Sequence, residues 1–281
     1  MKRKTLKIIC STLVLGMVAG AFVGCGASKA EGGQSEEGGK IAISGSTSVG
    51  PLMEKISEAY ESKNPVVTIE INQVGSSAGI KDTINKVSEI GMASRELKDE
   101  EKKEVKDTVI AYDGIAVVTN IKNPIKNITM EQIKDIYIGK ITNWKEIEGG
   151  KDGQIVVASR EDGSGTRDAF QEIVGYTSEE LAKDAMIANG NGGLKELVVG
   201  NENAIAFVSF EYLDDAVNSV NVEGVEPKAE LVKSGEYQIS RPFILVNKED
   251  AITENGQKLI DYILSEEGQK IVKDNKLIPL N

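Results

Sequence analysis

Short apolar runs, turns of small polar residues and amphipathic helical patterns follow one another along most of the chain. Val66–Val74 alternates apolar and polar side chains, and Gln154–Ala158 is an apolar run with β-branched residues, so both segments predict strands. After Pro51, a residue favoured at the first position of a helix, Leu52 and Ile56 recur at helical spacing. The repeated order of strand, turn and helix predicts an α/β fold with a mostly parallel sheet.

The same patterns predict further elements on both sides of these segments. Strands are expected at Lys40–Ser44, Ile90–Ser94, Thr108–Thr119, Ala204–Phe210 and Phe243–Val246. Helices are expected at Ile80–Val87, Lys98–Lys106, Thr129–Tyr137, Arg167–Val174, Gly192–Val199 and within Ala251–Lys273. In open α/β sheets ligands bind beyond the carboxyl ends of the strands, so the turns that follow strands are the candidate site.

Three such turns, each before a predicted helix, are rich in glycine, serine and threonine. They are Gly45–Gly50, Gly75–Gly79 and Ser159–Thr166. The unpaired N–H groups of a helix start favour an anion, and glycines allow the backbone to approach it closely. Arg160 adds a permanent charge and a fork of donors that matches a tetrahedral oxyanion. The three turns together predict one shared anion site, although each alone is compatible with an ordinary capped helix.

Composition and motifs exclude several other functions. The chain has 281 residues, of which 33 are basic and 44 acidic, and it has no histidine. This balance argues against nucleic-acid binding, and aromatic residues make up only 5% of the chain, which argues against a stacking platform. The absence of histidine excludes a Ser-His-Asp triad and a His-ligated metal. The third turn lacks the lysine of a nucleotide-binding P-loop, because Arg167 follows Thr166.

The first 24 residues have the layout of a secretory signal. A basic start that includes Lys2 and Arg3 precedes the apolar run Ile8–Val23, and Gly24 and Cys25 close it. A glycine before a cysteine at this place resembles a bacterial lipobox, so we expect Cys25 to carry a lipid; an uncleaved membrane anchor is the alternative. Cleavage removes four basic residues, takes the formal charge from −11 to −15 and leaves no cysteine pair for a disulfide. Residues 25–40 predict a flexible tether, because they are rich in Gly, Ser and Glu.

Several motifs, in this order, resemble the phosphate-binding proteins of bacterial phosphate ABC importers. They are Gly45–Ser48, Gly75–Gly79, Ile90–Glu96, Gly139–Trp144 with Glu146 and Ile147, Asp162–Thr166 and Ala204–Val208. The resemblance covers nearly all of the chain from Ile41 to Leu280 and implies a type II periplasmic-binding fold, with two α/β lobes joined by two crossing strands. It implies a first lobe of 41–113 and 241–281, a second lobe of 114–240, and crossings at Asp113-Gly114 and Ser240-Arg241-Pro242.

The resemblance also implies which residues bind the anion. The matching positions are Thr47, Ser48, Ser76, Arg160, Ser164, Gly165 and Thr166, with Ser77 as a further candidate. Asp162 matches the carboxylate that holds the arginine in place. Some family members carry an aspartate acceptor where this chain has Arg95, so we expect Arg95 either to bind the oxyanion or to pair with a neighbouring carboxylate.

Phosphate still carries a proton near neutral pH, so a selective site needs an acceptor that would repel sulfate. Asp113 at the lobe crossing is the candidate for this role, and a turn or capping role before Gly114 is the alternative.

These features predict an extracytoplasmic receptor, held by a lipid at the outer face of the cell membrane. It should capture inorganic phosphate and deliver it to the permease and ATPase subunits of an ABC importer. We expect a monomer that contacts the membrane only through its lipid, needs no cofactor or metal and is not an enzyme. The alternatives are a receptor for sulfate or molybdate, and a phosphoryl-transfer or hydrolytic enzyme that uses Ser164 or Thr166.

Overall fold

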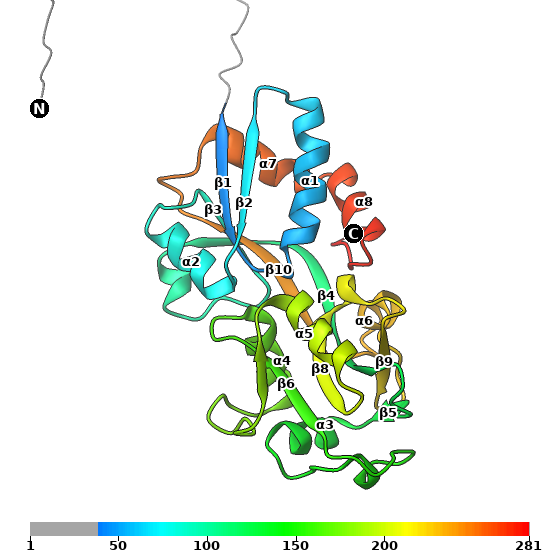
Figure 1. Cartoon of the computed structure of the whole chain (residues 1–281). Coiled ribbons are helices and arrows are strands. Elements are labelled where there is room, and N and C mark those ends of the chain that lie inside the picture. The colour runs from blue at the N-terminus through cyan, green and yellow to red at the C-terminus, as the bar shows by residue number, and fades with distance from the viewer. Residues whose placement is uncertain (1–38, 281) are drawn as a thin grey trace, which may run out of the picture. The chain divides into compact units, whose positions relative to one another are not determined.

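The computed structural model describes residues 39–280, which form an α/β fold (Figure 1). Its strands are β1 Lys40–Gly45, β2 Thr68–Gln73, β3 Ile90–Ala93, β4 Lys106–Asn120, β5 Asn127–Ile128, β6 Val156–Arg160, β7 Met186–Ala188, β8 Ala204–Ser209, β9 Val217–Val222 and β10 Ser240–Asn247. Its α-helices are α1 Gly50–Lys63, α2 Ser76–Ile84, α3 Met130–Tyr137, α4 Gly165–Val174, α5 Gly190–Gly200, α6 Ala229–Lys233, α7 Glu254–Leu264 and α8 Glu266–Asp274. Short 3₁₀ turns occur at η1 Glu101–Lys103, η2 Trp144–Glu146 and η3 Phe210–Tyr212.

One hydrogen-bonded path of strands runs in the order β2-β1-β3-β10-β4-β8-β6-β7. The pairs β1–β2, β1–β3, β6–β7 and β6–β8 are parallel, whereas β10 is antiparallel to both β3 and β4. The long strand β4 pairs with β10 up to Gly114 and with β8 and β9 from Ile115 onward. It therefore passes from one half of the fold to the other beside β10, as the two crossing strands of this fold class do (Figure 1).

The hydrophobic core falls into separate clusters on either side of this crossing. One cluster draws its buried residues from Ile115 to Ile239, and a second draws them from 41–111 and 243–277. We call residues 41–113 with 241–280 lobe 1 and residues 114–240 lobe 2. The residue limits of the two lobes are those expected from the sequence, and these limits stay a prediction. Residues 1–38, with the expected signal segment, Cys25 and most of the tether, lie outside the described residues.

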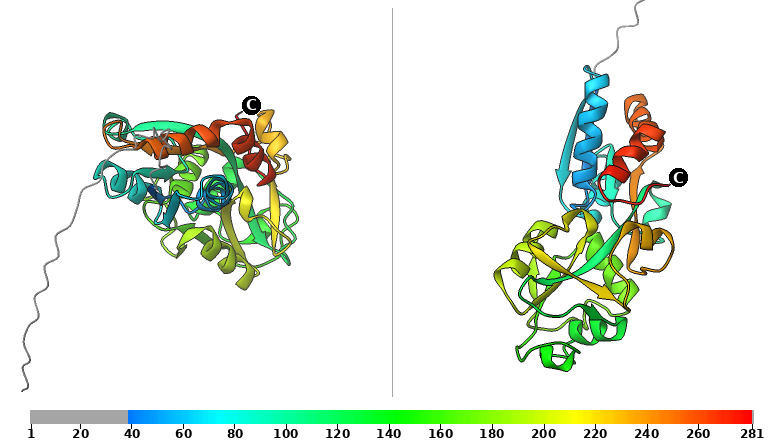
Figure 2. Two further views of the ribbon diagram at one scale, coloured as in Figure 1. Left: turned by 90° about the horizontal axis from the view of Figure 1, so that it is seen from above. Right: turned by 90° about the vertical axis from the view of Figure 1, so that its right-hand side faces the viewer.

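In lobe 1, helices lie on both faces of the sheet (Figures 1 and 2). Helices α1, α7 and α8 supply residues such as Leu52, Leu259 and Val272 to the cluster that covers one face. A smaller cluster joins Ile80 of α2 to Ala93 of β3. Burial on both faces explains the apolar runs of β3 and β10, whereas β2 at the edge of the sheet alternates and is largely exposed.

In lobe 2, several aromatic side chains pack together within the core. Phe170 of α4 stacks on Phe207 of β8 with ring centroids 4.1 Å apart, and Tyr137 of α3 packs against both rings. Helix α3 begins at a capping box, in which Thr129 and Gln132 exchange side-chain and backbone hydrogen bonds. Phe170 of α4 and Val157 of β6 belong to this core, which therefore holds in place the two elements that flank the third glycine-rich turn.

Two expected helices differ from the structure. The helix expected at Lys98–Lys106 is wrong: only η1 is helical there, and Lys106 already begins β4. Residues 98–104 have no apolar side chain to bury, and the apolar neighbours Leu97 and Val105 pack into the small cluster instead. Helix α2 begins at Ser76, not at Ile80, so the second polar turn is itself the first turn of the helix. Among residues 39–280, no helix is both long enough and apolar enough to span a bilayer.

Candidate oxyanion-binding site

The N-terminal ends of four helices meet where the two lobes face each other. Helices α1 and α2 come from lobe 1, and α4 and α5 come from lobe 2. Ser48, just before α1, lies 2.7 Å from the Thr166 hydroxyl of α4, and Asn191 of α5 donates a hydrogen bond of 2.8 Å to the Ser48 oxygen. The positive ends of these helix dipoles therefore converge on one place, which favours a negative charge there.

Helices α2 and α4 approach each other too closely for a side chain at one position. A Cβ atom at Gly165 would lie 2.3 Å from Ser76 Oγ, so only glycine fits there without a shift. Beside this contact, the Ser77 backbone N–H donates to the Gly163 carbonyl across the lobes at 3.1 Å. The first turn of α2 thus contacts the turn that precedes α4.

The hydroxyls at this meeting point are almost fully buried. Ser48 Oγ accepts hydrogen bonds from Asn191 and from Arg241, so its own hydrogen is left for Thr166 Oγ1. The Thr166 hydrogen then remains able to bond another acceptor. Ser164 caps α4 by accepting from the Arg167 backbone N–H at 3.2 Å. The cap leaves the Ser164 hydrogen as a second donor near the helix start.

Arg160 ends β6 and is 1% exposed. Its Nη2 donates to Thr47 of lobe 1 at 3.1 Å, and Glu161 binds the guanidinium by two hydrogen bonds of 2.7 and 2.8 Å. Burial alone would raise the pKa of Glu161, but the hydrogen bonds from Arg160 hold it below its ordinary value. Nη1 of Arg160 is buried and has no hydrogen-bond partner. The N–H groups of this nitrogen are therefore able to bind an acceptor that the protein does not supply.

The expectation that Asp162 holds Arg160 is wrong. The Asp162 side chain is 94% exposed and pairs with Arg167 at 2.7 Å. Glu161, directly after Arg160, takes that role and also accepts from the Gly190 N–H at the start of α5. Sequence spacing could not separate two adjacent carboxylates, because the direction of each depends on how the turn folds.

Arg95 pairs with carboxylates, which was one of its two expected roles. It forms a bidentate pair with Glu101, lies 3.1 Å from Asp168 of lobe 2 and donates to Ser77 Oγ. These partners occupy its guanidinium, so Arg95 connects the lobes beside the site and does not offer its charge to an anion. Burial tends to raise the pKa of Glu101, but the bonds from Arg95 hold it below its usual range.

Asp113 lies in the middle of β4, is fully buried, and is held by three donors. Its Oδ1 accepts from Ser209 Oγ and the Phe210 N–H, and its Oδ2 accepts from Arg241 of β10 at 2.8 Å. Burial raises the pKa of Asp113 to about 6, against the opposing effect of Arg241, and burial lowers the pKa of Arg241 to about 10. The Asp113–Arg241 pair joins the two crossing strands.

Most of the expected site residues lie together at the lobe interface. They are Thr47, Ser48, Ser76, Arg160, Ser164, Gly165 and Thr166, while Ser77 contacts Arg95 beside them. Sequence reasoning missed four further polar residues of the cluster, which are Ser46, Ser94, Asn191 and Arg241. Ser46, Ser94 and Arg241 had a usable signal, because they stand in the first turn, in the Ile90–Glu96 motif and at the second crossing. Among residues 39–280, no group of three or more His, Cys, Asp or Glu side chains could hold a metal ion.

Comparison with known families defines the class of this protein. A family model described as the PBP superfamily domain matches residues 30–267, which is most of the chain. The phosphate-binding protein PstS of Bacillus subtilis is 31% identical over 290 residues, a match that spans 100% of this chain and 95% of that protein. The chain therefore belongs to the PBP superfamily and, within it, to the family of PstS phosphate-binding proteins.

Solved structures agree with this assignment. A Clostridium perfringens structure, described as a phosphate ABC transporter substrate-binding protein with bound phosphate, is 59% identical, with a TM-score of 0.85. The match covers 86% of this chain and 100% of that one. An ABC-type phosphate transport receptor from Vibrio cholerae is 35% identical over 85% of this chain and 99% of its own, with a TM-score of 0.72. The expected two-lobe fold is thereby confirmed.

Proposed function

We propose that this protein captures inorganic phosphate between its lobes and delivers it to the permease and ATPase subunits of a phosphate ABC importer. The observation that carries the proposal is the buried, unpartnered Nη1 of Arg160 among four helix N-terminal ends. A buried N–H donor without an acceptor is unfavourable, and a tetrahedral oxyanion supplies the missing acceptor. The Clostridium perfringens relative, solved with bound phosphate, supports the choice of anion.

The two lobes supply complementary halves of this site. Thr47, Ser48 and Ser76 come from lobe 1, and Arg160 and Thr166 come from lobe 2. Neither half surrounds a tetrahedral ion alone, so phosphate should favour the closed arrangement by a hinge motion at β4 and β10. X-ray scattering should show a smaller radius of gyration with saturating phosphate, and an unchanged radius would contradict the clamp.

We propose that the site binds and does not catalyse. Ser164 Oγ is an acceptor in a helix cap, and Thr166 Oγ1 contacts only another hydroxyl. Neither hydroxyl has a general base beside it in these contacts, which nucleophilic attack would need. A calorimetric titration with phosphate, sulfate and molybdate, together with a phosphomonoester turnover assay, tests both statements. Turnover, or tighter binding of sulfate or molybdate than phosphate, would contradict the proposal.

We further propose that the mature protein is a monomer, carries a lipid on Cys25 and is held by it at the outer face of the cell membrane. The signal layout of residues 1–25 supports this, and the folded part begins more than ten residues later. Cys25→Ser should release the protein from membranes and leave phosphate affinity unchanged, because the site lies in residues 46–241. Cell fractionation measures the first effect and calorimetry the second. Membrane retention of the variant would show that the apolar segment itself is the anchor.

A further inference from the structure

We propose that Arg241 is a second anion-binding arginine of the site and that Asp113 is its counter-charge. The inference rests on the proposed function, because it names a further binding group for the same anion. It also assigns Asp113 a different role from the expected acceptor of the phosphate proton.

The position of Arg241 places it at the hinge. It lies on β10 opposite Asp113 on β4, in the register of the two crossing strands. Its side chain is 1% exposed and forms an ion pair of 2.8 Å with that carboxylate. A guanidinium held by both crossing strands keeps its place while the lobes rotate about them.

The guanidinium of Arg241 also reaches the first polar turn. Its Nη2 donates to Ser48 Oγ at 3.2 Å, the same oxygen that contacts Thr166 and Asn191 of lobe 2. Arg160 reaches the preceding residue, Thr47, from the other lobe. The two arginines therefore contact consecutive residues of one turn, from two directions.

Each arginine keeps unused donors in this buried space. Nε and Nη1 of Arg241 and Nη1 of Arg160 are buried and have no hydrogen-bond partner. A buried N–H without an acceptor is destabilising, and the two positive charges also repel each other. One oxyanion has enough acceptor oxygens to serve both guanidinium groups, and its charge would offset the repulsion.

Asp113, in contrast, has little capacity left for the anion. Three donors from the protein already use most of its about four lone-pair positions, and one of them is Arg241. The carboxylate of Asp113 therefore orients the buried guanidinium and offsets part of its positive charge. The remaining alternative is that the Asp113–Arg241 pair only joins the crossing strands.

The test compares the wild-type protein with Asp113→Asn/Arg241→Gln, in which both charges are replaced by neutral polar side chains. Phosphate should bind this double variant on the order of 100-fold more weakly by calorimetry, although the variant folds. The control is Lys63→Gln/Glu267→Gln, which removes an exposed ion pair between α1 and α8 that contacts neither arginine, and its affinity should stay within about threefold of wild type.

The outcomes separate the two proposals. A wild-type protein that does not bind phosphate overturns the proposed function. A wild-type protein that binds, together with a folded double variant of equal affinity, overturns only the role of Arg241. If the double variant does not fold, a crystal structure of the wild-type protein with phosphate decides. Nε or Nη1 of Arg241 should then lie within about 3.2 Å of a phosphate oxygen, and a distance beyond hydrogen-bond range would overturn the inference.

The single variant Asp113→Asn distinguishes the counter-charge from a proton acceptor. If Asp113 only balances Arg241, its neutralisation should strengthen phosphate and sulfate binding alike and leave their ratio unchanged. A ratio that moves toward sulfate would restore Asp113 as the acceptor of the phosphate proton and contradict its role as a counter-charge alone.

Discussion

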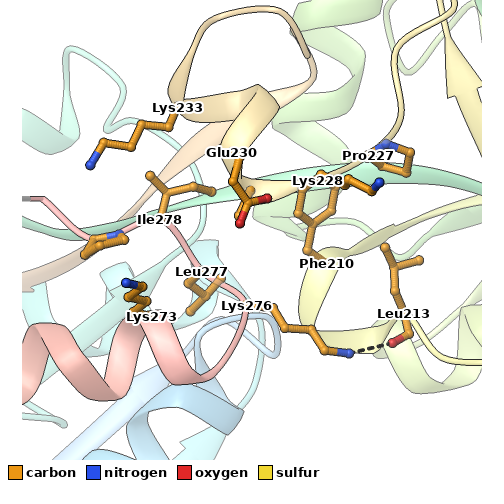
Figure 3. A pocket seen from close by; sticks show the side chains of 12 residues that line it. Phe210, Leu213, Pro227, Lys228, Glu230, Lys233, Lys273, Lys276, Leu277 and Ile278 are labelled. Carbon is orange, nitrogen blue, oxygen red and sulfur yellow. Dashed lines mark hydrogen bonds between the residues drawn. The ribbon is translucent and has the colours of Figure 1, made fainter.

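Two regions where the lobes meet differ in their charge and burial. In the candidate site, arginines and hydroxyls are almost fully buried and several donors have no partner. On another part of the lobe junction, a cavity of about 640 Å³ opens between α6 and the segment that follows α8 (Figure 3). Its lining residues are Phe210, Leu213, Pro227, Lys228, Ala229, Glu230, Lys233, Lys273, Lys276, Leu277, Ile278 and Pro279.

The cavity in Figure 3 is large enough for a ligand, but its lining lacks the buried, unpartnered donors of the candidate site. Lys276 donates to the Leu213 carbonyl at 3.0 Å, and Lys228 pairs with Glu226, so both cations have partners. Lysine side chains at an open rim keep their hydration, whereas a buried guanidinium has lost it. In this protein, buried N–H donors without a partner therefore point to the anion site more directly than cavity volume does.

Among the variants in the two regions, the largest loss of phosphate affinity should come from a change at Arg160. Arg160→Ala removes a buried guanidinium and leaves Glu161 unpaired, so phosphate binding should weaken by roughly 2–5 kcal/mol, the range for breaking a buried charge pair. Calorimetry measures this loss, with thermal unfolding as the check on folding. Unchanged affinity in a folded variant would remove Arg160 from the site.

Gly165→Ala should have the next largest effect, through lobe closure. The added Cβ would lie 2.3 Å from Ser76 Oγ and 2.9 Å from Ser94 Oγ, so the lobes could not meet without a shift. Overpacking of this kind costs roughly 1–3 kcal/mol, which should appear as weaker phosphate binding. Gly192→Ala on α5 is the matched control, because nothing lies within 4 Å of its Cβ. Equal affinities of the two variants would show that the close approach is not needed for binding.

The third prediction concerns how the stability of the protein depends on pH through Glu211 of η3. Burial and the neighbouring Asp113 raise its pKa to about 9, against the opposing charge of Arg241, and its Oε2 is buried without a partner. Because the folded state holds this proton more tightly than the unfolded state does, the stabilising effect is complete below about pH 4.5 and is lost as pH rises through about 9.

Glu211→Gln should remove this pH dependence. Urea unfolding at about pH 6 and about pH 9 should show that the wild type loses stability relative to the variant at the higher pH. A difference that is constant between the two pH values would show that Glu211 does not hold its proton in the folded protein.

The smallest effect should come from the cavity of Figure 3. Lys276→Ala removes one hydrogen bond from an exposed lysine, so phosphate affinity and stability should each change by no more than about 0.5 kcal/mol. A loss of affinity as large as that of Arg160→Ala would mean that the cavity belongs to the anion site.

The sequence by itself determined the fold class and most of the site. Glycine, serine and threonine turns between strands and helices mark places where backbone N–H groups are free, and this local chemistry does not depend on distant parts of the chain. The three turns and Arg160 therefore predicted one shared anion site, and the resemblance to phosphate-binding proteins implied Thr47 and Ser76 as further members.

Only the tertiary structure decided the partners of the charged side chains. Glu161 instead of Asp162 holds Arg160, Arg95 pairs with Glu101 and Asp168, and Arg241 reaches Ser48 across 193 positions of sequence. Such pairs depend on side-chain directions and on contacts between remote segments. Residue spacing along the chain does not encode them, because long charged side chains can reach several alternative partners until packing selects one.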